Sequence, residues 1–147
     1  MTLDHCPEPV RRLATWFNQL QPDTLDQLGG YYAEGARFKD PFNDVRGPEA
    51  IRGVFEHMYH SLDNPRFVVT GAVCQGDEAF LTWDFCFRFK RFNTTQEQTV
   101  KGTTHLRFDP AGLVLLHRDY WDVAEELYEK IPAVGAFMRW LKRRARS

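Results

Sequence analysis

Two short stretches of the chain place acidic and titratable side chains beside apolar ones. The first is Phe38-Lys39-Asp40-Pro41, and the second is His117-Arg118-Asp119-Tyr120-Trp121-Asp122. A carboxylate that lines an apolar cavity is either paired or functional, because burying it alone costs several kcal/mol. We therefore expect that any site for proton transfer draws on one or both of these stretches.

His117 and Asp119 are two positions apart in a predicted strand, so their side chains share one face, with Cβ atoms about 7 Å apart. A His–Asp pair, joined directly or through a water molecule, can act as general acid or base near neutral pH. Two structural alternatives remain open. The pair can be a buried polar pair bonded to a helix, or Asp119 can form a salt bridge with Arg37 or Arg46.

Asp40 and Asp122 each have a structural alternative of their own. Asp40 stands before Pro41, where an aspartate commonly accepts hydrogen bonds from the backbone of the following turn. Asp122 has the opposite strand parity from Asp119 and precedes a helical pattern. We interpret Asp122 as a helix N-cap, with Glu125 completing a capping box.

The periodicity of apolar residues predicts helices in the first part of the chain and strands after it. We expect a first helix at 10–20, a short second one around 25–32, a third opened by Gly47-Pro48, and a short strand at 36–40. The further predicted strands are 66–75, 80–92, 98–108 and 113–122, followed by helical segments at 123–130 and 132–146. This order indicates an α+β domain, with a curved antiparallel sheet wrapped around about three helices.

The strand at 80–92 alternates between apolar and polar residues. Its apolar face carries Leu81, Trp83, Phe85, Phe87 and Phe89. The opposite, convex face is charged, and cross-strand ion pairs are its simplest explanation. A homodimer through this convex face is also expected, and the two interpretations are compatible.

The composition places the chain among single-domain globular proteins. It has 147 residues, 43% hydrophobic and 27% charged, with a net charge of −1, so no overall field attracts nucleic acid or an anionic membrane. Three cysteines without a C-x-x-C pair predict reduced thiols in a cytoplasmic protein. Neither a signal peptide nor an apolar run long enough to span a membrane is recognisable.

Several motifs together resemble the NTF2-like superfamily, which includes SnoaL-type polyketide cyclases and ketosteroid isomerase. They are Tyr31-Tyr32-Ala33-Glu34, Phe38-Lys39-Asp40-Pro41, Gly47-Pro48-Glu49-Ala50-Ile51, the stretch from Leu106 to Gly112, and Tyr120-Trp121. The resemblance implies one domain over 1–147 with an NTF2-like cone, and a helical extension at 123–147. It also implies a conical, mostly apolar pocket between the sheet and the helices.

The resemblance assigns roles to residues of that pocket. Asp40 matches the proton-shuttling aspartate of the isomerase, whereas Thr104 and Trp16 stand where the isomerase has its two oxyanion donors, which disfavours ketosteroid isomerisation. Asp119 resembles the acid–base carboxylates of the polyketide cyclases and epoxide hydrolases. The expected catalytic residues are Asp40, His117 and Asp119. The expected pocket-lining residues are Trp16, Tyr32, Phe55, Tyr59, Trp83, Phe85, Phe87, Thr104 and Trp121.

The tail at 134–146 forms an amphipathic pattern with several arginines. We expect a helix that packs on the domain or on a neighbouring subunit, with an apolar stripe that helps to close the pocket mouth. A weak contact with an anionic membrane surface is the alternative.

His57 and His60 lack metal-ligand spacing, so we expect neither a metal nor a cofactor.

The leading functional hypothesis is a small-molecule-binding protein whose apolar ligand carries one or two oxygens. As an enzyme it would be a cofactor-independent isomerase, cyclase, dehydratase or epoxide hydrolase that uses Asp40 or Asp119 as acid or base. The alternatives are a non-catalytic module that binds a lipid or metabolite, and a structural or protein-interaction role.

Overall fold

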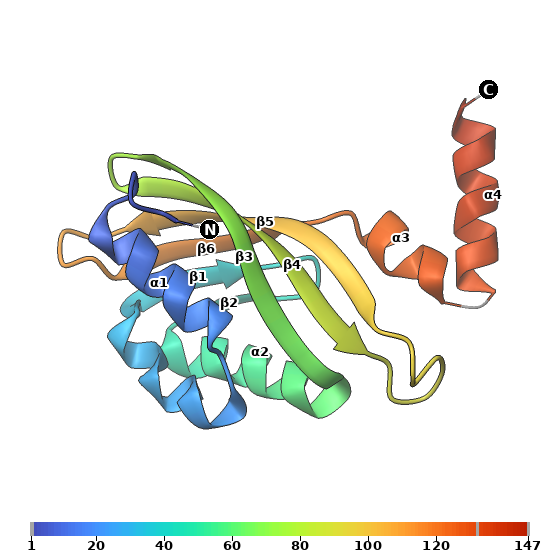
Figure 1. The fold of residues 1–147 in the computed structure, drawn as a ribbon, viewed down its shortest axis with the longest axis horizontal. Coiled ribbons are helices and arrows are strands. Elements are labelled where there is room, and N and C mark those ends of the chain that lie inside the picture. Colours follow the sequence, from blue (N-terminus) through green and yellow to red (C-terminus); the bar gives the residue numbers. More distant parts are fainter. Residues whose placement is uncertain (1, 132, 147) are drawn as a thin grey trace.

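A single curved sheet of six strands forms the centre of the molecule (Figure 1). The computed structural model describes residues 2–131 and 133–146. The strands are β1 (Tyr32–Lys39), β2 (Asp44–Arg46), β3 (Asp63–Gln75), β4 (Glu78–Arg88), β5 (Gln98–Phe108) and β6 (Val114–Tyr120). Their order across the sheet is β2-β1-β6-β5-β4-β3. The predicted α+β class is confirmed.

Helices precede and follow the long strands. They are α1 (Glu8–Asn18), the 3₁₀ helix η1 (Pro22–Gly30), α2 (Pro48–Ser61), α3 (Val123–Glu126), the 3₁₀ helix η2 (Tyr128–Lys130) and α4 (Val134–Arg146). α1, η1 and α2 bury their apolar residues with those of the sheet in one core. α2 starts at Pro48, directly after Gly47, whose φ of +88° is a conformation that favours glycine.

The first strand differs from its prediction. β1 begins at Tyr32, which the helical pattern assigned to the second helix, and β1 pairs in parallel with β6, with Phe38 opposite His117. The expectation of purely antiparallel strands is therefore wrong at this pair. The short strand β2, which pairs with the end of β1, was also not predicted. Three residues between turns carry too little periodicity to identify a strand.

The two faces of β4 have the predicted characters. Leu81, Trp83 and Phe87 are buried on one face. On the other face, Asp84 accepts a hydrogen bond from Lys101 at 3.0 Å. A second cross-strand ion pair joins Arg88 to Asp63 at 3.2 Å. These contacts confirm the cross-strand explanation of the charged face, while the expected dimer stays a prediction.

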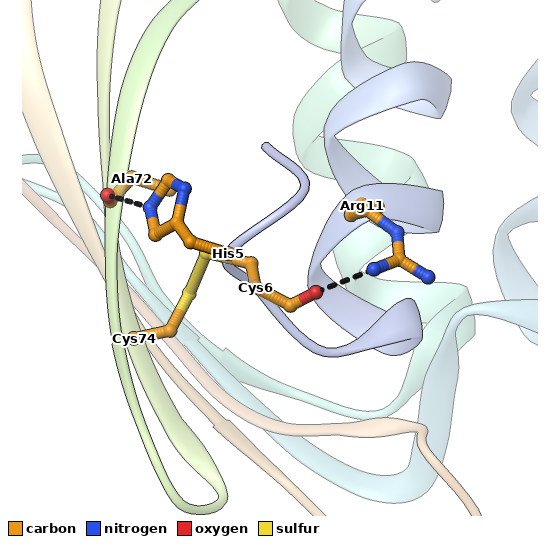
Figure 2. The surroundings of a disulfide bond; sticks show 5 residues. All are labelled: His5, Cys6, Arg11, Ala72 and Cys74. Atoms are coloured by element: carbon orange, nitrogen blue, oxygen red, sulfur yellow. Dashed lines mark hydrogen bonds between the residues drawn. A yellow bond between two sulfur atoms is a disulfide. The ribbon is translucent and has the colours of Figure 1, made fainter. Parts of the chain in front are cut away.

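Cys6 and Cys74 form a disulfide, so the prediction of three reduced thiols is wrong (Figure 2). The fold brings their Cα atoms to 5.7 Å, although 68 positions separate them in the sequence. His5 and Arg11 support the joined segment, through hydrogen bonds to the carbonyls of Ala72 (2.9 Å) and Cys6 (2.7 Å). Disulfides are rare in the cytosol, so the cysteines do not support the expected cytoplasmic location. Cys86 is a free, buried thiol.

The carboxyl-terminal extension confirms one prediction and corrects another. The Asp122 carboxylate accepts a hydrogen bond from the Glu125 amide at 3.1 Å, as expected of an N-cap. α4, however, makes its main contacts with η2 and stands at one end of the molecule, away from the sheet (Figure 1). The predicted packing of α4 on the body of the domain is therefore wrong, while its packing on a neighbouring subunit stays a prediction. Within the described ranges, no helix is both long and apolar enough to cross a membrane.

Candidate active site

A chain of hydrogen bonds on the inner face of the sheet converges on one oxygen of Asp119. The Asp119 Oδ1 atom lies 2.8 Å from His117 Nε2 and 2.5 Å from the Thr104 hydroxyl. The Trp83 indole donates to the Thr104 oxygen at 2.8 Å, and the Tyr32 hydroxyl lies 2.8 Å from His117 Nδ1. Four neighbouring elements thus supply one continuous network: β4, β5, β6 and β1.

The residues at the two ends of this network, Trp83 and Tyr32, both carry a proton. Trp83 can only donate, so Thr104 accepts from it and donates its own proton to Asp119. At the other end, burial first and the Asp119 charge second raise the pKa of Tyr32 well above 10.0, so its phenol keeps its proton. The Tyr32 hydroxyl shares a hydrogen bond with His117 Nδ1, and His117 Nε2 shares the next one with Asp119 Oδ1, so one ring joins the buried phenol to the carboxylate.

The hydrogen bonds to Asp119 leave its second carboxylate oxygen, Oδ2, available to accept a further hydrogen bond or a proton. Within the described chain, both of the Asp119 hydrogen bonds go to Oδ1, and none goes to Oδ2. The Asp119 side chain is 14% exposed and lines two neighbouring cavities, whereas that of His117 is only 4% exposed. Asp119 is therefore the member of the pair that lines the larger cavity, whereas His117 lines only the smaller one.

The larger cavity has a volume of about 300 Å³ and a mostly apolar wall. β1, β4 and β6 contribute to this wall, together with α2 and Leu127, which follows α3. Its lining comprises Phe38, Asp40, Phe42, Asn43, Val54, Phe55, His57, Met58, Ser61, Leu62, Phe67, Trp83, Phe85, Phe87, Val100, Asp119, Trp121 and Leu127. Such a wall suits an apolar molecule, and Asp119 is one of its few polar groups.

The smaller cavity, of about 20 Å³, adjoins the larger one, and Asp119 lines both. His117 and Thr104 are its further polar neighbours, and Phe17 of α1 closes it with its ring edge-on to His117, the ring centroids 5.7 Å apart. A space of this size is large enough for one water molecule.

Asp40 lines the larger cavity but its carboxylate is occupied by the following turn. Its Oδ1 accepts hydrogen bonds from the Phe42 amide (2.8 Å), the Asn43 amide (2.6 Å) and the Asn43 side chain (3.1 Å). These are the turn contacts anticipated as the structural alternative. The alternative salt bridge from Arg37 to Asp119 does not form, because Arg37 pairs with Asp44 at 2.8 Å.

The structure brings most, but not all, of the predicted lining residues to the cavities. Phe55, Trp83, Phe85, Phe87 and Trp121 line the larger one, and Thr104 lines the smaller one. Three predicted residues are absent from both linings, namely Trp16, Tyr32 and Tyr59.

Trp16, Tyr32 and Tyr59 lie elsewhere in the fold and are wholly or partly buried. Trp16 is buried behind Phe55 and stacks on Tyr31, with ring centroids 4.8 Å apart. Its indole nitrogen has no hydrogen-bond partner among the described residues. Tyr32 lies behind His117, and Tyr59 is half-buried on α2, where burial and the Asp23 charge raise its pKa to about 12.

Sequence reasoning predicted Phe55 of α2 and Asp40 but missed further cavity residues on α2 and in the turn after β1. His57 and Ser61, expected to face solvent or left unassigned, line the larger cavity with their side chains 3.2 Å apart. Their i, i+4 spacing on the helix could have indicated the pair. Phe42 was not predicted either, and its ring meets Trp121 edge-on with centroids 5.8 Å apart.

Solved structures with the same fold come from several bacteria. A protein from Catenulispora acidiphila with a ketosteroid isomerase-like fold, solved with trimethylamine, aligns with a TM-score of 0.68 at 21% identity, over 83% of this chain and 91% of the other. An LEH-like epoxide hydrolase from M. tuberculosis has a TM-score of 0.66 at 15% identity, with coverages of 83% and 88%.

A third structure, from Shewanella putrefaciens, is provisionally assigned as a SnoaL-like polyketide cyclase. It has a TM-score of 0.66 at 15% identity, over 82% of this chain and 96% of the other. At these identities the likeness establishes the fold alone. Comparison of the sequence with curated proteins found no match.

Residues 10–117 match the SnoaL-like domain family. The matched part contains α1, η1, α2 and the sheet as far as His117, while Asp119, Trp121 and the helical extension follow it. Since the match spans most of the chain and the fold agrees with it, this chain belongs to the SnoaL-like domain family and has the NTF2-like fold.

Proposed function

We propose that the protein binds an apolar small molecule bearing a carbonyl oxygen and moves a proton on it, with Asp119 as the general base. The observation that carries this proposal is the convergence of His117 and Thr104 on one oxygen of Asp119. These two contacts fix the carboxylate at Oδ1, while Oδ2 accepts no hydrogen bond from the described residues and Asp119 lines an apolar cavity. A fixed carboxylate with one available oxygen is suited to general acid–base catalysis.

The simplest reaction for such a site is an isomerisation or a ring closure. Asp119 takes a proton from a carbon next to the carbonyl, and the electron pair of the broken C–H bond moves into an enolate. In isomerisation, the protonated Asp119 delivers a proton to a different carbon of the ligand, and exchange of this proton with solvent labels the ligand in D₂O. In ring closure, the enolate carbon attacks a second carbonyl and Asp119 protonates the oxygen that becomes a hydroxyl.

Hydrolysis of an epoxide is the second candidate, and the smaller cavity favours it. A water molecule in that space would lie beside Asp119 and close to the larger cavity, since four residues, Asp119 among them, line both spaces. Asp119 would then remove a proton from the water while the water oxygen attacks an epoxide carbon and the C–O bond to that carbon breaks. The alkoxide formed by ring opening takes this proton from Asp119, which gives the diol and restores the carboxylate. The epoxide hydrolase with the same fold makes this reaction a reasonable one to test.

Hydrogen exchange in heavy water measures the proposed proton transfer directly. Native mass spectrometry of the full chain first identifies any copurifying molecule, and a panel of cyclic ketones and enones is then followed by NMR in D₂O. We expect the protein to accelerate deuterium uptake next to the carbonyl of a bound ketone. Asp119→Asn should lower this rate by about 100-fold or more, as expected for the loss of a general base.

Asp40→Asn is the matched control, because the amide oxygen of Asn can still accept the hydrogen bonds of the turn at residues 42–43. It should retain most of the exchange rate. Loss of exchange in Asp40→Asn and retention in Asp119→Asn would transfer the role to Asp40. If no ketone exchanges and racemic cyclic epoxides gain ¹⁸O from labelled water, hydrolysis is the function. Tight binding without either reaction would indicate a carrier and contradict the proposal.

A further inference from the structure

The helix α4 is attached to the rest of the molecule by its polar side. Arg139 donates a hydrogen bond to the Glu129 carbonyl at 2.8 Å, and Lys142 lies 3.3 Å from the Glu129 carboxylate. Gly135 permits the close approach, because a Cβ atom there would stand 2.1 Å from the Glu129 carbonyl oxygen. Since these three helix residues are spaced by four and three positions, they lie on one side, and that side faces η2.

The opposite side of α4 presents apolar and aromatic side chains to solvent. Val134, Phe137, Trp140 and Leu141 are 42%, 57%, 48% and 40% exposed. The Phe137 and Trp140 rings stack with centroids 6.0 Å apart. An amphipathic helix of a globular domain normally turns this side toward the core. Here the apolar stripe, defined by these four residues, is exposed on the side of α4 opposite to its contacts with Glu129. α4 itself stands at one end of the molecule (Figure 1).

The charges of the chain are segregated around this stripe. All 20 Asp and Glu residues lie before α4, whereas α4 itself contains five of the 19 Lys and Arg residues. Arg143 and Arg146 are exposed, and the Arg144 guanidinium lies over the Trp140 ring, 5.8 Å from its centroid. A partner that covers the stripe must therefore be apolar in its interior and anionic at its surface.

The size of the stripe distinguishes between a protein partner and a lipid surface. A helix of 13 residues is about 20 Å long, so one side of it offers roughly 200 Å², while a stable protein interface needs about 800 Å² from each partner. A bilayer needs no complementary shape, since the apolar side chains enter the boundary between headgroups and acyl chains. We propose that α4 binds the surface of an anionic membrane, with its apolar stripe inserted and its arginines against the lipid phosphates.

The geometry places the body of the protein on the water side of this contact. Glu129 holds α4 by the side opposite to the stripe, so insertion of Phe137 and Trp140 does not require α4 to leave η2. A stripe of four side chains on one short helix gives a reversible contact rather than a permanent anchor. This inference is independent of the chemistry in the cavity.

Vesicle cosedimentation of the full chain tests the proposal. One set of vesicles is pure phosphatidylcholine, and the other is an equimolar mixture with phosphatidylglycerol. We expect binding to the anionic vesicles only, weakening as salt is raised. The double variant F137S/W140S should lose at least about tenfold in partition coefficient, because two large apolar groups no longer leave water. R143E/R146E should lose at least about tenfold as well, through charge.

Matched controls separate the helix from general surface effects. V68S/V73S removes two exposed apolar side chains of β3, and R46E/R91E makes the same change in net charge as R143E/R146E on other exposed positions. Both controls should bind like the wild type. Failure of the wild type to bind anionic vesicles would overturn the proposal. So would a dimer, seen by analytical ultracentrifugation, that F137S/W140S converts to a monomer, because the stripe would then bind a second copy.

Discussion

The Trp83 indole occupies the space that any side chain at Gly102 would need. The two residues are cross-strand partners on β4 and β5, and a Cβ atom at Gly102 would stand 2.3 Å from the Trp83 ring. No real Cβ contact is that short, so this ring position depends on glycine. The same ring donates its hydrogen bond to Thr104, which in turn donates to Asp119. Gly102 therefore acts on the candidate site through Trp83.

Gly102→Ala should displace the Trp83 ring and weaken its hydrogen bond to Thr104. Overpacking of this kind costs about 1–3 kcal/mol in the free energy of unfolding, measured by urea denaturation. Ligand binding in the larger cavity should weaken too, because Trp83 lines it. Gly53→Ala is the control: no atom lies within 4 Å of its new methyl group, and alanine in a helix is more stable than glycine by roughly 0.5–1 kcal/mol. Equal stability of Gly102→Ala and the wild type would contradict this assignment.

Tyr32 predicts a loss of stability at alkaline pH. Burial raises the pKa of its folded form well above 10.0, so above that pH the unfolded chain ionises at this residue while the folded chain does not. The stability that Tyr32 contributes is fully present below pH 10 and is lost as the pH rises toward the folded pKa. One such group lowers the free energy of unfolding by about 1.4 kcal/mol per pH unit in that window.

Tyr32→Phe should remove this slope, and urea denaturation between pH 9 and about 11 measures it. Tyr59, whose pKa is raised to about 12, adds a background that is the same in both proteins, so the difference between them isolates Tyr32. Tyr128→Phe, at an exposed position, should keep the wild-type slope. If the free energy of unfolding fell equally steeply with pH in the wild type and in Tyr32→Phe, the Tyr32 hydroxyl would reach water in the folded protein.

The parts of the site that local periodicity determines could be predicted from the sequence. Strand parity alone places His117 and Asp119 on one inner face and separates Asp122, which caps α3. The sequence order of elements likewise predicts the α+β fold. Thr104 was predicted to line the pocket, but its bond to Asp119 depends on the register between β5 and β6, which pairs the two residues directly.

Contacts between distant segments could not be predicted in this way. Tyr32 was assigned to a helix, and its bond to His117 requires β1 to run parallel beside β6. The pattern of α4 shows that the helix has an apolar side, but it does not say which side faces the body. The contacts of Glu129 with α4, including the close approach at Gly135, turn the polar side of the helix toward η2 and leave its apolar side exposed to solvent. The same limit explains why Cys6 and Cys74 were taken for free thiols.

The disulfide connects the segment before α1 to β3, and this has a consequence for the candidate site. α1 carries Phe17, which closes the smaller cavity beside His117, and Asn18, whose side chain accepts a hydrogen bond from the Val69 amide at 2.8 Å. The bond between Cys6 and Cys74 restrains the other end of the same helix. Reduction should therefore loosen α1 on β3 as well as lower the stability of the whole domain.

C6S/C74S should lower the free energy of unfolding by about 2–4 kcal/mol, because a bond that closes a loop of this length restricts the unfolded chain. Dithiothreitol should lower the stability of the wild type by the same amount and leave C6S/C74S unchanged. Cys86→Ser is the control, since it keeps the disulfide and should respond to dithiothreitol like the wild type. Hydrogen exchange should also quicken in α1 more than in β5 and β6, neither of which is paired with β3. If dithiothreitol left the free energy of unfolding of the wild type unchanged, the disulfide would be contradicted. If hydrogen exchange quickened equally in all elements, the disulfide would not restrain α1 in particular.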